Sequence, residues 1–359
     1  MSRVHNFSAG PAALPLEVLE TIRNDLPDWL GSGMSVMEVS HRGKDFVELA
    51  ARAETTLRDL LKVPDDYSVL FPQGGATMQM AMAPMNLTGP DDTADYIVTG
   101  SWGKKAAGEA KKFCSVNVVA DASDKKFTYI PDESTWERSE DAAYLHYTPN
   151  ETIAGVEFQF VPGGDVPLVA DMSSNILSRP IDVSRFGVIY AGAQKNIGPA
   201  GITLVIVRNE LLDRARANNP HLMTWKAYAE SDSMTNTPPT FAWYVADLVF
   251  QWLQGRGGVE AMGEINERKA SKLYAAIDGS DFYSNPVTKD CRSRMNVPFI
   301  LADDALDKRF LEDSAAAGLT NLKGHRSVGG MRASIYNAVG EDAVDALIAF
   351  MAAFEKANG

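Results

Sequence analysis

Short apolar runs that alternate with helical segments constrain the fold of this 359-residue chain more than any other feature. These runs lie at 68–71, 96–99, 116–119, 143–147, 168–170, 188–191 and 202–207. A run that is apolar throughout is typical of a strand buried on both faces of a sheet. Strands that alternate with helices favour a parallel arrangement in which the helices cover the sheet. The sequence therefore predicts an α/β fold with a mostly parallel central sheet.

Helical patterns flank this region, and the pattern changes after Pro239. Apolar residues recur at three- and four-residue steps at 16–26, 44–61, 241–254 and 259–277. The remaining expected elements are strands at 295–301 and 330–335 and helices at 305–317 and 341–354. We therefore expect a large domain over 16–257 and a smaller α+β domain over 258–359, joined by the N-terminal segment 1–15.

Composition bounds the partners and the compartment. The net charge of −13 repels nucleic acid and anionic membranes, so we expect neither as a partner, and an anionic ligand needs a local cluster of positive groups. The most apolar helical stretch, 241–253, is shorter than the ~20 residues that cross a bilayer, and no export signal is visible. Cys114 and Cys291 have no metal-like spacing. They favour a reducing cytoplasm, and we expect no metal site.

One lysine lies in a loop of small residues between two expected strands. Lys195 follows Ala191-Gly-Ala-Gln and precedes Asn-Ile-Gly198. Open α/β sheets bind ligands in loops at their strand ends. A partly buried amine there has a lowered pKa and is nucleophilic toward an aldehyde. A lone lysine is more often simply ion-paired at the surface, so this interpretation depends on the neighbouring strand ends.

Three other strand ends carry residues with matching chemistry. Gly75 and Ala76 open a helix whose N-terminus attracts anions, although a plain turn accounts for them equally well and the lysine of a nucleotide P-loop is absent. Trp102 either stacks on an aromatic ligand or packs in the core. Asp171 either caps a helix or keeps a pyridine nitrogen protonated. In chain order, a glycine-rich helix start, an aromatic ring, an acid and a lysine form the pattern of a pyridoxal phosphate site.

The chain closely resembles the phosphoserine aminotransferase family, a branch of the fold-type I aminotransferases, essentially from end to end. The strings that carry the resemblance are NFSAGPA (6–12), SHR (40–42), QGGA (73–76), HYTPNET (146–152), DMSSN (171–175), QKNIG (194–198), NTPPT (236–240), GHR (324–326) and GGMRASI (329–335). Several of them, especially the last, are specific to that family.

The resemblance implies pyridoxal 5′-phosphate as cofactor and a role for each matching residue. Lys195 would bind the cofactor covalently, and Asp171 would pair with its ring nitrogen. Trp102 would stack on the ring, and Thr152 would reach the ring hydroxyl. The cofactor phosphate would contact Gly75, Ala76 and Gln194, together with Asn236 and Thr237 from the second subunit of a homodimer.

The resemblance also implies the substrates. The amino group of L-glutamate would pass to 3-phosphohydroxypyruvate, a phosphorylated 2-oxo acid, giving O-phospho-L-serine and 2-oxoglutarate. This is a step of serine biosynthesis, and the family also allows the phosphohydroxythreonine step of vitamin B6 synthesis. The residues expected to bind these substrates are His41, Arg42, His325, Arg326 and Arg332.

Alternatives remain open at this point. Some family members have arginine after the Gly-Gly-Ala turn, where this chain has Thr77, so one possible contact with the substrate phosphate is missing. Related enzymes of this fold use glyoxylate with alanine or serine, or remove sulfur from cysteine with a loop thiol, for which Cys291 is a weak candidate. A non-enzymatic binding module would leave Lys195 idle.

Overall fold

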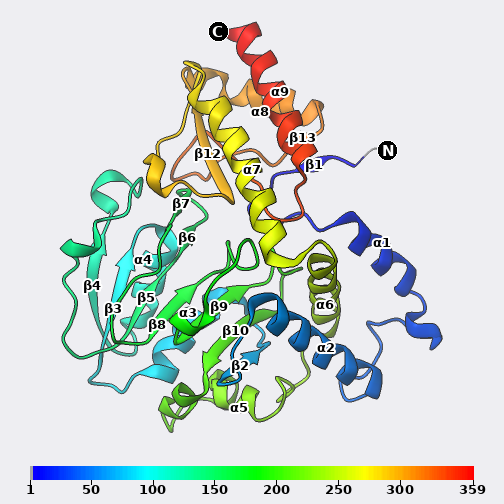
Figure 1. Cartoon of the computed structure of the whole chain (residues 1–359), viewed down its shortest axis with the longest axis vertical. Coiled ribbons are helices and arrows are strands. Elements are labelled where there is room, and N and C mark those ends of the chain that lie inside the picture. Colours follow the sequence, from blue (N-terminus) through cyan, green and yellow to red (C-terminus); the bar gives the residue numbers. More distant parts are fainter. Residues whose placement is uncertain (1–2) are drawn as a thin grey trace.

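The structure, a computed structural model, describes residues 3–359. Its centre is a seven-stranded sheet covered by helices, which confirms the predicted mostly parallel α/β fold (Figure 1). In spatial order the strands are β2 (Tyr67–Leu70), β10 (Thr203–Arg208), β9 (Val188–Gly192), β8 (Leu168–Asp171), β5 (Ala142–Tyr147), β3 (Thr93–Val98) and β4 (Ser115–Asp121).

Alternate residues of the strands face two separate helix layers. Leu204 and Ile206 of β10 join a core with α2 (Lys44–Leu61) and α6 (Thr240–Gly255). Val205 and Val207 join a second core with α3 (Gly75–Leu87), α4 (Ser101–Ala110) and α5 (Trp225–Ala229). Successive side chains of a strand point to opposite faces of the sheet. Runs that are apolar throughout therefore build a three-layer structure.

One strand of the large sheet runs against the others. β10 is antiparallel to both β2 and β9, whereas β9, β8, β5, β3 and β4 are mutually parallel. The connection between β9 and β10 spans 193–202, and a parallel crossover needs a dozen or more residues. The chain therefore returns directly, and Lys195 lies in this short connection.

The expected elements are present, with shifted ends. The clearest shift is β3, which we predicted from Tyr96 and which begins at Thr93. Asp95 interrupts the apolar pattern, yet it is buried because its carboxylate accepts hydrogen bonds from Asn117 and Ser139. A buried polar residue with partners is thus hidden from a prediction based on apolar runs. Helices α4 and α5 were not predicted.

The C-terminal part builds a second core on a small antiparallel sheet. Its strands are β11 (Tyr283–Ser284), β12 (Asn296–Leu301) and β14 (Met331–Ser334), with helices α7 (Gly258–Asp278), α8 (Asp307–Ala316) and α9 (Glu341–Asn358) around them. The N-terminal β1 (His5–Asn6) pairs with β13 (Leu319–Thr320), and Phe7 joins this second core. The remaining elements are the hairpin β6 (Asn150–Glu151) and β7 (Val156–Glu157) and, before α2, the helix α1 (Leu16–Asp25).

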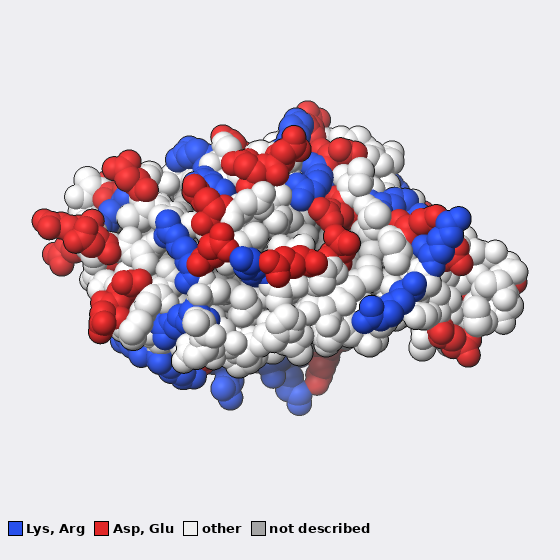
Figure 2. Space-filling model, turned by 90° about the horizontal axis from the view of Figure 1, so that it is seen from below, with Lys and Arg blue, Asp and Glu red and all other residues white. Residues whose placement is uncertain are grey.

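Within 3–359, no helix is both long and apolar enough to cross a membrane. The same part of the chain holds no group of three or more His, Cys, Asp or Glu side chains that could bind a metal ion. On the face in Figure 2, acidic and basic side chains are interspersed, so the net charge of −13 does not form a continuous acidic field there.

Candidate active site

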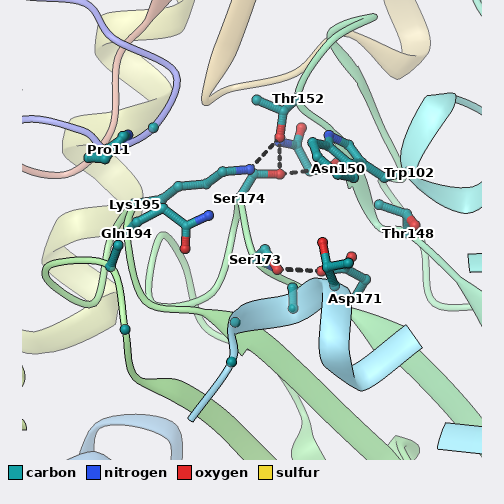
Figure 3. A pocket seen from close by; sticks show the side chains of 17 residues that line it. Pro11, Trp102, Thr148, Asn150, Thr152, Asp171, Ser173, Ser174, Gln194 and Lys195 are labelled. Carbon is teal, nitrogen blue, oxygen red and sulfur yellow. Dashed lines mark hydrogen bonds between the residues drawn. The ribbon is translucent and has the colours of Figure 1, made fainter. Parts of the chain in front are cut away.

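A cavity of about 470 Å³ lies where the carboxyl ends of the parallel strands meet. Because β2, β3, β5, β8 and β9 all end at this edge, the segments that follow them converge on one space. Figure 3 shows these side chains pointing into it. The lining residues are Gly10, Pro11, Gly74, Gly75, Ala76, Thr77, Trp102, Thr148, Asn150, Thr152, Asp171, Ser173, Ser174, Gln194, Lys195, Ala200 and Gly201.

Lys195 extends into the cavity from the connection between β9 and β10. Its side chain is almost fully buried, and Nζ donates one hydrogen bond, to Thr152 Oγ1 at 2.6 Å. Burial lowers the pKa of the amine to about 8; Asp171 and Glu151 act in the opposite direction, and Arg332 lowers it further. The amine is therefore easier to deprotonate than an exposed lysine, and it has room for a ligand beside it.

Asp171 ends β8 across the cavity from Lys195 (Figure 3). Its Oδ1 accepts hydrogen bonds from Ser173 N at 3.0 Å and Ser173 Oγ at 2.5 Å. Burial raises the pKa of this carboxyl, whereas the bonds from Ser173 and the charge of Lys195 lower it. Oδ2 makes no hydrogen bond within 3–359, so it is open to a cationic partner. The local hydrogen bonds to Ser173 use Oδ1 and thus leave the second oxygen open to a ligand.

The N-terminus of α3 lines the same cavity as Lys195. Gly74 and Gly75 have positive φ angles of 98° and 68°, which bend the chain sharply before the helix. A Cβ on Gly74 would lie 2.6 Å from Met78 Sδ, whereas a Cβ on Gly75 would meet nothing within 4 Å. The space above Gly75 is therefore open to a ligand, and the helix N-terminus favours an anionic one.

Comparisons with known proteins agree with this geometry. The model of the family "Aminotransferase class-V" matches residues 4–347. The chain is 60% identical over 357 residues to a phosphoserine aminotransferase of Hahella chejuensis, and the match covers 99% of both chains. It is 58% identical over 358 residues to the Pseudomonas aeruginosa phosphoserine aminotransferase, again over 99% of both chains. The chain belongs to the phosphoserine aminotransferase family, within the class-V aminotransferases.

Solved structures give the same result. The Bacillus circulans subsp. alkalophilus phosphoserine aminotransferase is 46% identical, with a TM-score of 0.97 over 99% of both chains. A phosphoserine aminotransferase from Trichomonas vaginalis, described as PLP bound, is 44% identical, with a TM-score of 0.94 over 98% of this chain and all of that one. An alanine–glyoxylate aminotransferase from Nostoc has a TM-score of 0.78 at 17% identity, over 98% of this chain and 95% of that one, so it shares the fold alone.

The structure brings together most of the residues expected to bind the cofactor. Seven of them line the cavity: Gly75, Ala76, Trp102, Thr152, Asp171, Gln194 and Lys195. Asn236 and Thr237 do not line it, but Thr237 O accepts a hydrogen bond from Gln73 Nε2 at 2.7 Å, next to the start of α3. Their expected role lies in the partner subunit's site and stays a prediction.

The residues expected to bind the substrate are more dispersed. Arg332 on β14 donates to Thr152 O at 3.2 Å, which places its guanidinium at the edge of the cavity. His41, Arg42, His325 and Arg326 do not line the cavity, and both Arg42 and Arg326 are exposed. Only Arg332 is therefore held beside the cavity by a contact within the single chain, and the other four assignments stay predictions.

Sequence reasoning missed several lining residues. Gly10 and Pro11 reach the cavity because Ala12 N donates to Gln194 O at 2.9 Å, beside Lys195. Thr148 follows β5 directly, next in register to Asp171. One signal was that these residues, like the missed Asn150, Ser173 and Ser174, fall inside strings that carry the family resemblance. A second, weak signal was that 146–152 closes a strand with hydroxyl and amide groups.

Thr77, which takes the place of an arginine found in some family members, has a basic neighbour. Thr77 Oγ1 accepts a hydrogen bond from Lys105 Nζ at 3.1 Å, and the same ammonium lies 5.5 Å from the centroid of the Trp102 ring. Thr77 and Trp102 both line the cavity. The ammonium group of Lys105, on α4, therefore lies near Thr77, the position at which some family members have arginine.

Proposed function

We propose that this protein is a pyridoxal phosphate-dependent phosphoserine aminotransferase. It would transfer the amino group of L-glutamate to 3-phosphohydroxypyruvate and yield O-phospho-L-serine and 2-oxoglutarate. The observation that carries the proposal is the buried Lys195 amine, which shares one cavity with the Asp171 carboxylate and the N-terminus of α3. Relatives that are about 60% identical and bear this name support it.

The residues present fit this cofactor. The open space above Gly75 at the α3 N-terminus suits its phosphate, Trp102 offers a ring to stack against, and Asp171 Oδ2 is open to the protonated ring nitrogen. Two buried polar atoms on lining residues, Trp102 Nε1 and Thr148 Oγ1, have no hydrogen-bond partner within 3–359. Buried polar groups are rarely left unpaired, so a ligand in this cavity is the expected partner.

When bound, pyridoxal phosphate supplies an aldehyde that reacts with amines and a ring that takes up the electron pair left when the substrate loses its α-proton. The Lys195 amine would hold the cofactor covalently. With a substrate bound, Nζ would take the proton from the substrate α-carbon and deliver it to the carbon of the former aldehyde, so that the amino group stays with the cofactor. The lowered pKa of Lys195, about 8, suits both tasks. Asp171 stays ionised to hold the ring nitrogen protonated.

The remaining side chains bind and orient the substrates. Arg332, beside Thr152, is suited to a carboxylate because its planar group makes two parallel hydrogen bonds. We assign it to the α-carboxylate that all substrates share. Arg326 with His325, and His41 with Arg42 from the partner subunit, would hold the substrate phosphate.

A homodimer completes this proposal. Exposed apolar side chains gather in the segment before His41 and Arg42: Leu30 is 70% and Met37 59% exposed, and Leu26 and Met34 are also exposed. Large apolar groups that lie close together on a surface are typical of an interface.

We also propose that the protein acts in the cytoplasm, and that 16–257 and 258–359 with 1–15 form its two domains. The separate second core and the β1–β13 pairing support this division.

The direct test uses the purified protein with glutamate and 3-phosphohydroxypyruvate. We expect a yellow protein whose absorption changes on addition of glutamate alone, and stoichiometric phosphoserine and 2-oxoglutarate when both substrates are present. A colourless protein that binds no pyridoxal phosphate would overturn the proposal and favour a binding module.

The substrate assignment has its own test. A charge-assisted contact contributes roughly 1.5 to 3 kcal/mol, so Arg332→Ala and Arg326→Ala should each lower kcat/KM by about ten- to a hundredfold. Arg332→Ala should slow the glutamate and phosphoserine half-reactions alike, whereas Arg326→Ala should reduce the preference for phosphoserine over serine. Equal losses on phosphoserine and serine in Arg326→Ala would remove the phosphate assignment. Activity with glyoxylate in place of 3-phosphohydroxypyruvate would favour an alanine or serine:glyoxylate aminotransferase. An assay with the phosphohydroxythreonine substrate tests the step of vitamin B6 synthesis.

A further inference from the structure

Glu151, a buried carboxylate, contacts the backbone that carries Trp102. The residue ends β6, between Asn150 and Thr152, and its side chain is completely buried. Its Oε2 accepts a hydrogen bond from Trp102 N at 3.1 Å, and its Oε1 accepts one from Gly103 N at 2.7 Å. These two amides belong to the first turn of α4, so a residue 49 positions along the chain caps this helix.

The sequence of the helix start leaves room for this contact. Gly100, the N-cap residue of α4, has no side chain of its own to accept the amide hydrogens. A Cβ on Gly100 would lie 2.2 Å from the Glu151 carboxyl carbon, and a Cβ on Gly103 would lie 3.3 Å from Oε1. Two glycines at this turn are thus matched to one distant carboxylate.

We propose that Glu151 is a positioning residue of the active site: it fixes Trp102 relative to Thr152 and keeps a negative charge next to Thr152, the hydrogen-bond partner of Lys195. The inference rests on the proposed function, because it concerns the residues assigned to the cofactor. Trp102 is attached to Glu151 by a hydrogen bond, and Thr152, the hydrogen-bond partner of Lys195, follows Glu151 directly in the chain. Glu151 therefore links the end of β6, which precedes Thr152, to the start of α4, which carries Trp102.

The charges around Glu151 define its second role. Burial raises its pKa to about 7, the bonds from Gly103 N and Trp102 N lower it, and the charges of Asp171 and Lys195 act in opposite directions. Both oxygens accept an amide hydrogen, an arrangement that suits the ionised form, in which both oxygens are strong acceptors and neither carries a hydrogen. The ionised carboxylate in turn raises the pKa of Lys195, which Asp171 also raises and Arg332 lowers.

The test compares Glu151→Gln with Glu157→Gln. Glu157 is the control because its carboxylate is also fully buried and accepts from a backbone amide, Arg294 N at 2.8 Å. Unlike Glu151, its side chain makes no hydrogen bond within 3–359 to a residue that lines the cavity. The readouts are the melting temperature, the Kd of the apoprotein for pyridoxal phosphate, and the pH midpoint of the absorption change of the bound cofactor.

Both variants should lower the melting temperature, but only Glu151→Gln should change the cofactor site. We expect its Kd for pyridoxal phosphate to rise by about tenfold or more, because a Gln side chain has one acceptor oxygen for two backbone N–H groups and then no longer holds Trp102 in place. We expect its absorption midpoint to move to lower pH, because a negative charge near the amine is gone. If Glu151→Gln matches Glu157→Gln in Kd and midpoint, the residue is merely structural and the inference fails.

A second variant keeps the inference testable if Glu151→Gln does not fold. Gly100→Ala keeps the negative charge but displaces the carboxylate, so the Kd should rise while the midpoint moves less than in Glu151→Gln. An unchanged Kd in Gly100→Ala would overturn the positioning role. If the wild-type protein itself binds no pyridoxal phosphate, the proposed function fails instead, so the two failures are distinguishable.

Discussion

Two buried lysines, Lys195 and Lys269, have opposite surroundings. Lys195 Nζ has one hydrogen-bond partner, Thr152 Oγ1, and faces a cavity. Lys269, on α7 beside the small sheet, donates to three backbone carbonyls, Ile335 O at 2.9 Å, Tyr336 O at 3.0 Å and Val339 O at 2.8 Å. Burial lowers the pKa of both amines, to about 8 at Lys195 and about 7 at Lys269.

The difference shows that burial alone does not make a lysine reactive. Three carbonyl acceptors match the three donors of an ammonium group, so the Lys269 site is saturated and fixes the turn after β14. The Lys195 amine keeps unused hydrogen-bonding capacity and faces a cavity with the Asp171 carboxylate across it. A lowered pKa indicates chemistry where the amine can also reach a ligand.

The largest effect should follow from removing the reactive amine. Lys195→Ala should lower turnover by about 10³-fold or more, since attachment of the cofactor and proton transfer both depend on this nitrogen. Its melting temperature should stay near that of the wild type, because the side chain makes a single hydrogen bond. Steady-state kinetics and thermal unfolding measure the two quantities.

Borohydride reduction and peptide mapping serve as the control for this prediction. The reduced cofactor should be found on Lys195 and not on Lys269. Reduced cofactor on Lys269 or on another lysine would contradict the assignment of Lys195 as the reactive amine.

Removal of Lys269, whose three donors are all paired, should lower stability and leave activity unchanged. Lys269→Met keeps the length of the side chain but leaves three carbonyls without their donor, so we expect a loss of about 2–5 kcal/mol in the free energy of unfolding. The kcat/KM of the folded enzyme should be unchanged. Urea unfolding measures the loss, with Lys272→Met as control, because Lys272 lies on the same helix in an exposed pair with Asp345. Equal stability of the two variants would contradict the structural role.

The pH dependence of cofactor attachment sharpens the comparison. Only the neutral amine attacks an aldehyde, and a pKa lowered to about 8 means that this form becomes dominant above that pH. The rate at which the apoprotein reacts with pyridoxal phosphate should therefore rise about tenfold per pH unit below pH ~8 and level off above it. Stopped-flow absorbance follows the reaction. A rise that continues to pH ~10 would show an ordinary lysine pKa.

The smallest effect should come from the exposed Lys105. Because an exposed charge contributes only about 0–1 kcal/mol, Lys105→Gln should raise the Kd for pyridoxal phosphate by up to about fivefold, and high salt should abolish the difference. Lys104→Gln removes the same charge from the neighbouring exposed position of α4 and should leave the Kd unchanged. Equal Kd values for both variants would show that the charge of Lys105 does not contribute to cofactor binding.

The sequence by itself determined the layers of the large sheet and the main polar groups of the site. Apolar runs and helical periodicity predicted the strands and most of the helices around them. Lys195 and Asp171 stood out because they follow apolar strands, where open sheets place their ligands. Those features are local, so they can be predicted from a few adjacent residues.

Only the tertiary structure decided which distant groups meet. It brought Gly10 and Pro11 to the wall of the cavity and placed Glu151 against the start of α4, 49 residues earlier in the chain. It also separated the two buried lysines, because the partners of Lys269 lie 66 to 70 residues away from it. Apolar periodicity records which side of an element is buried. It carries no information on which carbonyl, amide or carboxylate from a distant segment will contact a buried group. Those hydrogen-bond partners decide whether a buried charge is structural or reactive.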